Sequence, residues 1–123
     1  MKSDIDAIMQ ASNLDALIVF GNAEHNPPMY YLTGGGHVSH AVLIKKRGED
    51  AAYFHNDMER DEAAKSGLRL IPYSKYDYDA LFKKANGDLL LASALRYQMM
   101  FEELGVTEGR VGLYGSYDLS AVF

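Results

Sequence analysis

The sequence predicts a single α/β domain in which helices cover both faces of a mixed β-sheet. Short apolar segments with the composition of strands alternate with segments whose apolar residues repeat at helical spacing. Two of the strand segments are separated only by the turn Arg47 to Asp50, which indicates an antiparallel hairpin. We therefore expect three layers, α/β/α, around a sheet of five or six strands.

The first third of the chain predicts a helix, a strand and a helical turn. Ser3 can cap a helix that runs to about Asn13, with Asp6 as a weak capping-box partner. The continuous apolar run Ala16 to Phe20 is typical of a strand that is covered on both faces. We expect Asn26 to Pro28 to keep the next loop extended. Pro28 to Thr33 then forms one helical turn.

The middle of the chain predicts the hairpin and an edge strand. A second strand is expected from His37 to Arg47, and Ala51 to His55 returns as its partner. Asp57 is expected to cap a short helix that runs to Lys65. Leu68 to Tyr73 forms a fourth strand, and Pro72 marks it as an edge strand or as its last paired residue.

The last third predicts two helices and a fifth strand. A helix covers Tyr76 to Asn86. A second helix begins at Asp88 and ends before Gly105, with an apolar stripe of Leu90, Ala94, Tyr97, Phe101 and Leu104. Arg110 to Tyr114 is a strand, and a helix is expected to begin in Ser116 to Phe123. A helix that has barely begun suggests a chain cut from something larger.

The composition of the chain excludes or disfavours several classes of protein. The 123 residues are 48% apolar and 24% charged, which is ordinary for one folded domain. The net charge of −5 disfavours binding to nucleic acid or anionic membranes. No apolar run approaches the roughly 20 residues of a membrane span, and no secretory signal is expected. The absence of cysteine excludes disulfides and fits the cytoplasm. We interpret the basic run Lys45 to Arg47 as a solvated strand end.

Three groups of residues could carry chemistry, and each has a simpler explanation. Gly34 to Gly36 could cradle a phosphate, but they precede a strand rather than a helix, so a flexible turn is favoured. His37 and His40 would point to opposite faces of a strand, which disfavours a metal site. Four carboxylates could include a pair of acid–base catalysts, but we favour the interpretation that they lie on the solvated face at the start of a helix: Asp57, Glu59, Asp61 and Glu62.

Tyr31-Leu32-Thr33-Gly34 resembles the "YLTG" signature of the amino-terminal domain of the pita-bread metallohydrolases, which include Xaa-Pro dipeptidases, aminopeptidase P and creatinase. Two softer resemblances support it. The acidic segment Asn56 to Ala64 is similar to a stretch in relatives, and Val111 to Tyr114 is similar to a late strand. The sequence departs from the pattern at Asn26 to Met29, where two prolines stiffen the loop.

The resemblance implies a ribonuclease H-like fold over residues 1–123, with the catalytic pita-bread domain absent from this chain. It implies no catalytic or metal-binding residue here, and two divalent ions (Mn, Co or Zn) in the parent enzyme. It also implies packing on the catalytic domain, a homodimer and a proline-containing peptide substrate. Residues 34–40 would reach the partner subunit's active site, with His37 and His40 facing substrate. Tyr30 and Tyr31 begin this loop, and one of them is expected to anchor it in the core.

Two other functions remain open at this point. The chain could be a free-standing α/β module that binds a small ligand or regulates a partner. It could also be a compact metal-dependent enzyme that uses its histidines. The sequence does not distinguish dipeptides, longer peptides with proline in second place, or a non-peptide amide such as creatine as the parent's substrate.

Overall fold

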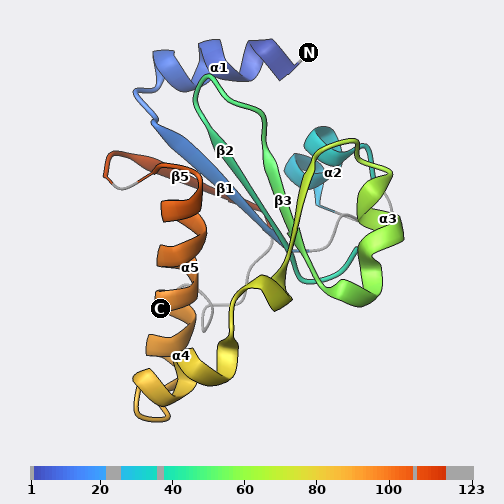
Figure 1. Ribbon diagram of the computed structural model, residues 1–123. Helices are drawn as coiled ribbons and strands as arrows, with labels where there is room; N and C mark the ends of the chain where they lie inside the picture. The colour runs from blue at the N-terminus through green and yellow to red at the C-terminus, as the bar shows by residue number, and fades with distance from the viewer. Residues whose placement is uncertain (1, 22–25, 36–37, 107, 116–123) are drawn as a thin grey trace.

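The fold is a five-stranded mixed sheet with helices on both faces (Figure 1). The computed structural model describes residues 2–21, 26–35, 38–106 and 108–115. The strand order is β4-β3-β2-β1-β5, with β1 at Ala16–Gly21, β2 at Ala41–Lys46, β3 at Ala52–His55, β4 at Arg69–Pro72 and β5 at Val111–Gly115. β2 is antiparallel to β1 and β3, whereas β5 is parallel to β1 and β4 is parallel to β3. Among the described strands, therefore, β2 alone runs against the others.

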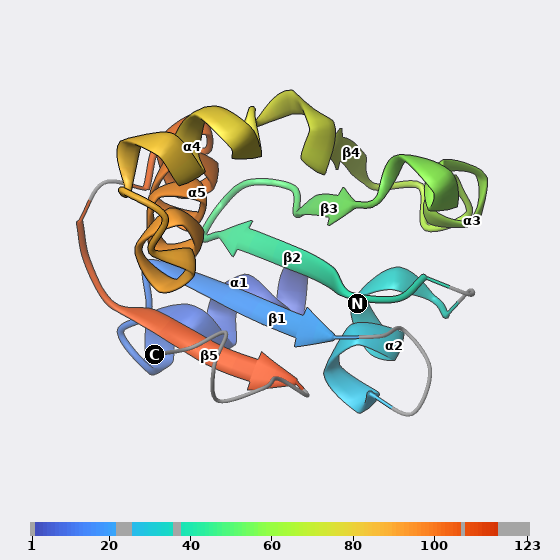
Figure 2. The same ribbon diagram turned by 90° about the horizontal axis from the view of Figure 1, so that it is seen from below.

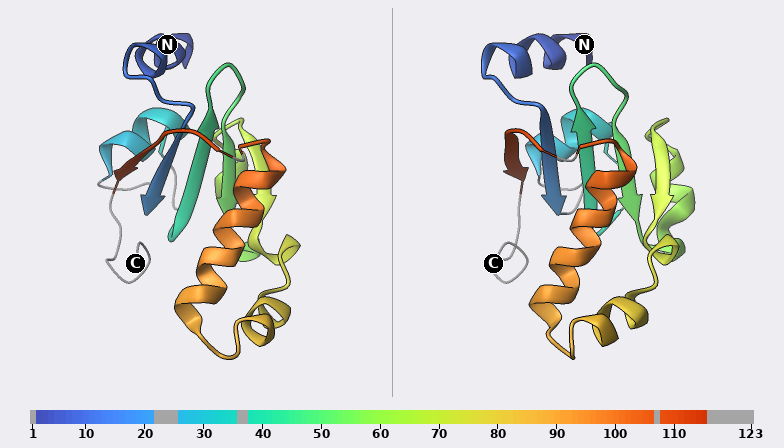
Figure 3. Two further views of the ribbon diagram at one scale, coloured as in Figure 1. Left: turned by 90° about the vertical axis from the view of Figure 1, so that its left-hand side faces the viewer. Right: turned by 60° about the vertical axis from the view of Figure 1, so that its left-hand side comes forward.

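The helices form two layers, one on each face of the sheet (Figure 2). Their bounds are α1 Lys2–Ala11, α2 Pro27–Thr33, α3 Arg60–Ala64, α4 Tyr78–Lys84 and α5 Leu89–Glu103, with 3₁₀ turns at Asp57–Glu59 (η1) and Tyr73–Lys75 (η2). One core joins α1, α2 and α3 to the sheet, and α5 packs on the opposite face, which it crosses in Figure 3. The predicted three-layer α/β domain is confirmed. None of the described helices has the length and apolarity to cross a bilayer.

The central strands explain why apolar residues run without interruption in the sequence. In β1, Leu17 and Val19 belong to the core under α1 and α2, whereas Ile18 and Phe20 belong to the core under α5. Successive side chains of a strand point to opposite faces, so a strand with both faces covered needs apolar residues at every position. The prediction for Ala16 to Phe20 is confirmed by the burial of all five residues.

Several predicted boundaries are wrong near the amino terminus. α1 begins at Lys2, so Ser3 lies within the helix and not at the predicted N-cap position. The prolines do not extend the loop, because Pro27 and Pro28 form the first turn of α2, where their missing N–H groups cost nothing. β2 begins at Ala41 instead of His37, because His40 has a left-handed backbone conformation (φ 51°) that ends strand pairing.

The carboxy-terminal half follows the prediction more closely. Asp88 caps α5 by accepting hydrogen bonds from the amides of Leu90 and Leu91. β4 is an edge strand that ends at Pro72, as predicted. Asp77 caps α4, so that helix starts two residues later than predicted. The predicted helix at Ser116 to Phe123 lies outside the described residues.

The predicted apolar stripe of α5 is correct only in the carboxy-terminal half of the helix. Tyr97, Phe101 and Leu104 pack against the core of the sheet. Leu90 is 47% exposed, and Ala94 is also exposed. The beginning of α5 extends beyond the sheet and packs instead against α4, in a small cluster of Leu81, Ala85 and Ala92 with Tyr78 and Leu95 at its margin. The first half of α5 therefore packs in a second, local core with α4, and not against the sheet as predicted.

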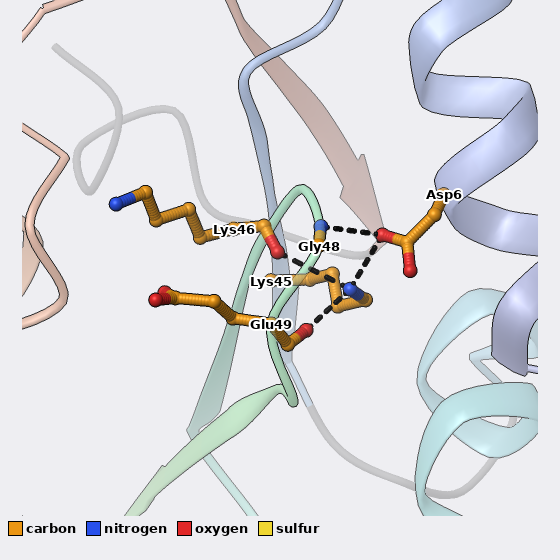
Figure 4. Close-up of polar contacts among 5 residues, drawn as sticks. All are labelled: Asp6, Lys45, Lys46, Gly48 and Glu49. Atoms are coloured by element: carbon orange, nitrogen blue, oxygen red, sulfur yellow. Dashed lines mark hydrogen bonds and ion pairs between the residues drawn. The ribbon is translucent and has the colours of Figure 1, made fainter.

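The amino edge of the sheet contains a buried ion pair that the sequence did not reveal (Figure 4). The Lys45 ammonium lies 2.8 Å from an Asp6 carboxylate oxygen and also donates to the backbone carbonyls of Lys46 and Glu49. The same carboxylate oxygen accepts the Gly48 amide at 2.8 Å. The expected solvated strand end is therefore wrong for Lys45, whose side chain is only 6% exposed. This contact ties α1 to the β2–β3 turn.

Candidate functional site

The described segments that follow β1, β3 and β4 meet at one edge of the sheet, which we call the carboxyl edge. It comprises α2, residues 38–40, η1 and η2, because β1, β3 and β4 end there and β2 begins there. In open α/β sheets, ligands bind outside the carboxyl ends of the strands. The sequence-predicted site residues of the described chain, Tyr30, Tyr31 and His40, all belong to this edge.

The Tyr31–Gly34 motif divides into buried structural residues and exposed ones. Leu32 is buried in the core, and the buried Thr33 hydroxyl donates to the Met29 carbonyl at 2.7 Å and accepts the Gly35 amide at 3.2 Å. Gly34 adopts the left-handed conformation (φ 80°) and ends α2, as predicted. Leu32, Thr33 and Gly34 therefore build the end of α2.

Both tyrosines of α2 are available to a ligand or partner. Tyr30 is 62% exposed and Tyr31 is 60% exposed. The expectation that one of them anchors the loop in the core is wrong, because Met29 and Leu32 occupy the buried positions of this short helix. The ring of Tyr30 lies against Gly35, where an added Cβ would approach its Cε2 to 3.1 Å. Because glycine has no Cβ, Gly35 leaves room for the Tyr30 ring.

The loop that follows the motif is held at its far end by residues from distant segments. Val38 is buried in the core, and the Ser39 amide and hydroxyl donate to the two Glu59 carboxylate oxygens at 2.9 and 3.0 Å. The His40 carbonyl accepts the Tyr73 hydroxyl at 2.8 Å. His37 lies outside the described residues, whereas the His40 side chain is exposed. His40 precedes β2, so the expectation that it lies on a strand face is wrong.

The acidic segment after β3 contributes to this edge more than the sequence suggested. Asp57 does not cap a helix, because its carboxylate accepts the Ser74 hydroxyl at 3.0 Å. Glu59 binds Ser39, so the interpretation of the whole run as a solvated face is wrong for Glu59. These two carboxylates, with Met58, line a cavity of about 570 Å³. Met58 is 98% exposed at its rim.

Burial perturbs two tyrosine hydroxyls close to this edge. Burial raises the pKa of Tyr53 to about 12, the Glu59 carboxylate acts in the same direction, and the Thr33 hydroxyl opposes them. Burial also raises the pKa of Tyr73, and the nearby Arg96 guanidinium opposes this effect. Both phenols therefore stay protonated at neutral pH. They act as hydrogen-bond donors or packing groups and not as bases.

The described residues do not fit a metal ion. They contain no group of three or more histidine, aspartate or glutamate side chains that could hold one. His55 is buried, and its Nδ1 lies 2.7 Å from the Asn56 carbonyl oxygen, while Asp57 binds Ser74. His55 and Asp57 therefore each bind another residue. His25 and His37 lie outside the described residues.

Sequence reasoning missed the contacts that shape the carboxyl edge. Ser39 and Glu59 are 20 positions apart, and His40 and Tyr73 are 33 positions apart, so no local pattern could connect them. Tyr73, Tyr76 and Tyr78 form a cluster of tyrosines in the sequence. Such a cluster indicates core packing with the hydroxyls at the surface, but not that the Tyr73 hydroxyl holds the loop.

Comparison with known proteins identifies the family. The profile of the family described as "Creatinase/Prolidase N-terminal domain" matches residues 3–113. The chain belongs to this family. The Tyr31–Gly34 motif and strands β1 to β4 lie within the matched range, and β5 begins within it, which confirms the resemblance stated above. A search of the curated proteins finds no match.

Solved structures similar to this creatinase/prolidase-type domain include two prolidases and an aminopeptidase P. The prolidase from Pyrococcus horikoshii OT3 is 26% identical, with a TM-score of 0.46 over 65% of this chain. The prolidase from Pyrococcus furiosus is 20% identical, with a TM-score of 0.46 over 62%. The Xaa-Pro aminopeptidase from Streptococcus thermophilus is 20% identical, with a TM-score of 0.47 over 95% of this chain and 89% of that chain. The aligned part covers only 22% of each prolidase chain.

Proposed function

We propose that this chain is the non-catalytic amino-terminal domain of an Xaa-Pro metallopeptidase of the prolidase or aminopeptidase P type. The match of residues 3–113 to the creatinase/prolidase N-terminal domain carries the proposal. Residues 1–123 form this domain, and the catalytic pita-bread domain is encoded in sequence outside this chain. The two divalent ions (Mn, Co or Zn) that activate water in such enzymes are held by that domain, since the described residues here offer no ligand cluster.

Within the parent enzyme, the domain packs on the catalytic domain, mediates homodimerisation and controls access of proline-containing peptides to the partner subunit's active site. The exposed Tyr30 and Tyr31 support this role, because tyrosines are enriched where proteins bind partners. His37 and His40 face the substrate, where each imidazole can donate a hydrogen bond or, when protonated, meet a carboxylate. We place the protein in the cytoplasm, in keeping with its lack of cysteine.

The contacts of Ser39 and His40 give the gating proposal a physical basis. A loop that recognises substrate has to be held in position by its supporting residues. Here Glu59 fixes Ser39 through two hydrogen bonds, and Tyr73 fixes the His40 carbonyl through a third. At the other end, Thr33 fixes the Gly35 amide. The loop is therefore anchored on both sides of its central residues.

Kinetics of the complete protein test this proposal. His37→Ala and Tyr30→Ala should each lower kcat/KM for an Xaa-Pro dipeptide by about tenfold, the value of one lost hydrogen bond of about 1.4 kcal/mol. Phe82→Ala in α4 is the control, because this exposed aromatic residue belongs to a helix that packs with α5, on the face of the sheet opposite α2. Unchanged kinetics in both loop variants would exclude gating.

Hydrolysis of the dipeptide by residues 1–123 alone would contradict a non-catalytic role. A complete protein that light scattering finds to be monomeric would contradict dimerisation.

A further inference from the structure

Arg96 of α5 lies among three tyrosine rings and has no anionic partner in the described chain. Its guanidinium carbon lies 4.9 Å from the centre of the Tyr73 ring, 5.6 Å from that of Tyr97 and 5.8 Å from that of Tyr78. Its Nε is buried, and no acceptor within the described ranges bonds to it. We call these four residues the Arg96 cage. Aromatic faces attract a cation, but they provide no hydrogen-bond acceptor that matches its donors.

The rings of the Arg96 cage are fixed by contacts of their own. Tyr73 donates its hydroxyl to the His40 carbonyl. Tyr97 meets the Phe20 ring edge to face, with centroids 5.9 Å apart. Tyr78 packs against the small core between α4 and α5. The guanidinium is therefore held in place before any ligand arrives, which reduces the entropy lost on binding.

Two other cations that are buried or partly buried in the described chain have carboxylate partners. Lys45 pairs with Asp6, and Arg47 pairs with Asp15. Removing an arginine from water without an anion to receive its hydrogen bonds is unfavourable. Arg96 departs from this pattern among the described residues. Its environment is that of a cation site whose anion comes from outside the described chain.

We propose that the Arg96 cage binds the carboxylate group of a small-molecule ligand, such as the terminal carboxylate of a short peptide. A planar carboxylate can accept two parallel hydrogen bonds from a guanidinium fork, and the overall charge of −5 disfavours a doubly charged phosphate. Tyr73 also lines the cavity of about 570 Å³, but Arg96 does not, and Asp57 and Glu59 line it as well, so the carboxylate would bind at the cage itself. A proline ring could pack on these tyrosines, as proline does in aromatic-lined grooves. Only this choice of a proline peptide rests on the proposed function.

Titration of the unaltered chain with matched ligands tests the proposal. The Arg96 Nε–H signal would be followed by ¹H–¹⁵N NMR while acetate or glycyl-proline is added at constant ionic strength. Acetamide and glycyl-prolinamide are the controls, since each lacks only the negative charge. Saturable shifts with the carboxylates and none with the amides would support the site. Equal responses to both members of each pair would overturn it, and so would linear shifts without saturation.

Variants connect the response to Arg96. Arg96→Met should abolish saturation, and Arg96→Lys should weaken binding by about tenfold because an ammonium lacks the planar fork. Arg110→Met removes an exposed arginine at the other edge of the sheet and should leave binding unchanged. Retained affinity in Arg96→Met would overturn the proposal. If that variant does not fold, the titrations of the unaltered chain with each carboxylate and its matched amide still test the proposal. Acetate binding without glycyl-proline binding would keep the carboxylate site and reject the peptide ligand, leaving the proposed function to the kinetic test above.

Discussion

Replacing Asp6 by alanine should destabilise the chain more than replacing Lys45 by methionine, although both changes remove the same ion pair. In Asp6→Ala, the Lys45 ammonium stays buried with only two carbonyls as acceptors, and the Gly48 amide loses its partner. Breaking a buried pair from one side costs about 3–5 kcal/mol. The Asp6 side chain is 36% exposed, so water can enter beside it, and we expect the lower end, about 3 kcal/mol.

Lys45→Met removes the charge that is costly to bury. Asp6 keeps its hydrogen bond from Gly48, and its exposed side can be hydrated. Methionine is a flexible apolar side chain, and position 45 points to the same face of the sheet as Leu17 and Leu43 of the core. The carbonyls that lose a donor belong to Lys46, which is partly exposed, and Glu49, which is exposed. We therefore expect a cost of about 1 kcal/mol or less.

Urea unfolding followed by circular dichroism measures both free energies of unfolding, provided that the m-value is unchanged. Lys65→Met is the matched control, because Lys65 forms an exposed pair with Glu62 that should be worth less than about 0.5 kcal/mol. If Lys45→Met cost as much as Asp6→Ala, the reasoning from desolvation would be refuted. The pair would then stabilise the fold by direct attraction.

Two further predictions concern pH and the end of α2. The Gly48 amide, and then Lys45, lower the pKa of Asp6 from its ordinary 3.8, so the stability it contributes is full above that value and is lost as pH falls through the lowered folded-state pKa. Urea midpoints between about pH 2 and 5 should therefore fall less steeply in Asp6→Asn, and parallel curves would contradict this linkage. Thr33→Val should cost about 1–2 kcal/mol in urea unfolding, because it removes the hydrogen bonds of the hydroxyl, including those with Met29 and Gly35, without changing the shape of the side chain. Thr33→Ser keeps the hydroxyl and should cost less, and an equal loss in both variants would point to the methyl group instead.

The features predicted correctly from the sequence are those whose cause is local. The strand at Ala16 to Phe20 follows from its unbroken apolar run, the cap at Asp88 from a short acidic side chain before a helix, and the edge position of β4 from Pro72. Each signal acts within a few residues of its effect. The parallel pairing of β1 with β5 joins residues 95 positions apart, and the sequence predicted a mixed sheet but not this pairing.

The features missed are polar contacts between distant segments. Asp6 was interpreted as part of a helix start, but its partner is 39 positions away in β2. Glu59 was interpreted as solvated, but it binds Ser39. A side chain with hydrogen-bonding capacity can satisfy it in water or in protein, and its residue type does not reveal which. The candidate site was therefore located by the family motif, whereas its supporting residues required the structure.

These contacts hold both ends of β2, which is central and antiparallel to its neighbours. Its amino end follows His40 at the carboxyl edge, where Tyr73 binds the loop, and its other end carries Lys45, which Asp6 binds. The two contacts lie at opposite ends of β2 and share no residue, so changes at the two ends should be roughly additive. Stability and gating should therefore be separable in this domain. The ion pair at one edge mainly sets the free energy of unfolding, and the Tyr73 contact at the other sets the position of the residues proposed to meet substrate.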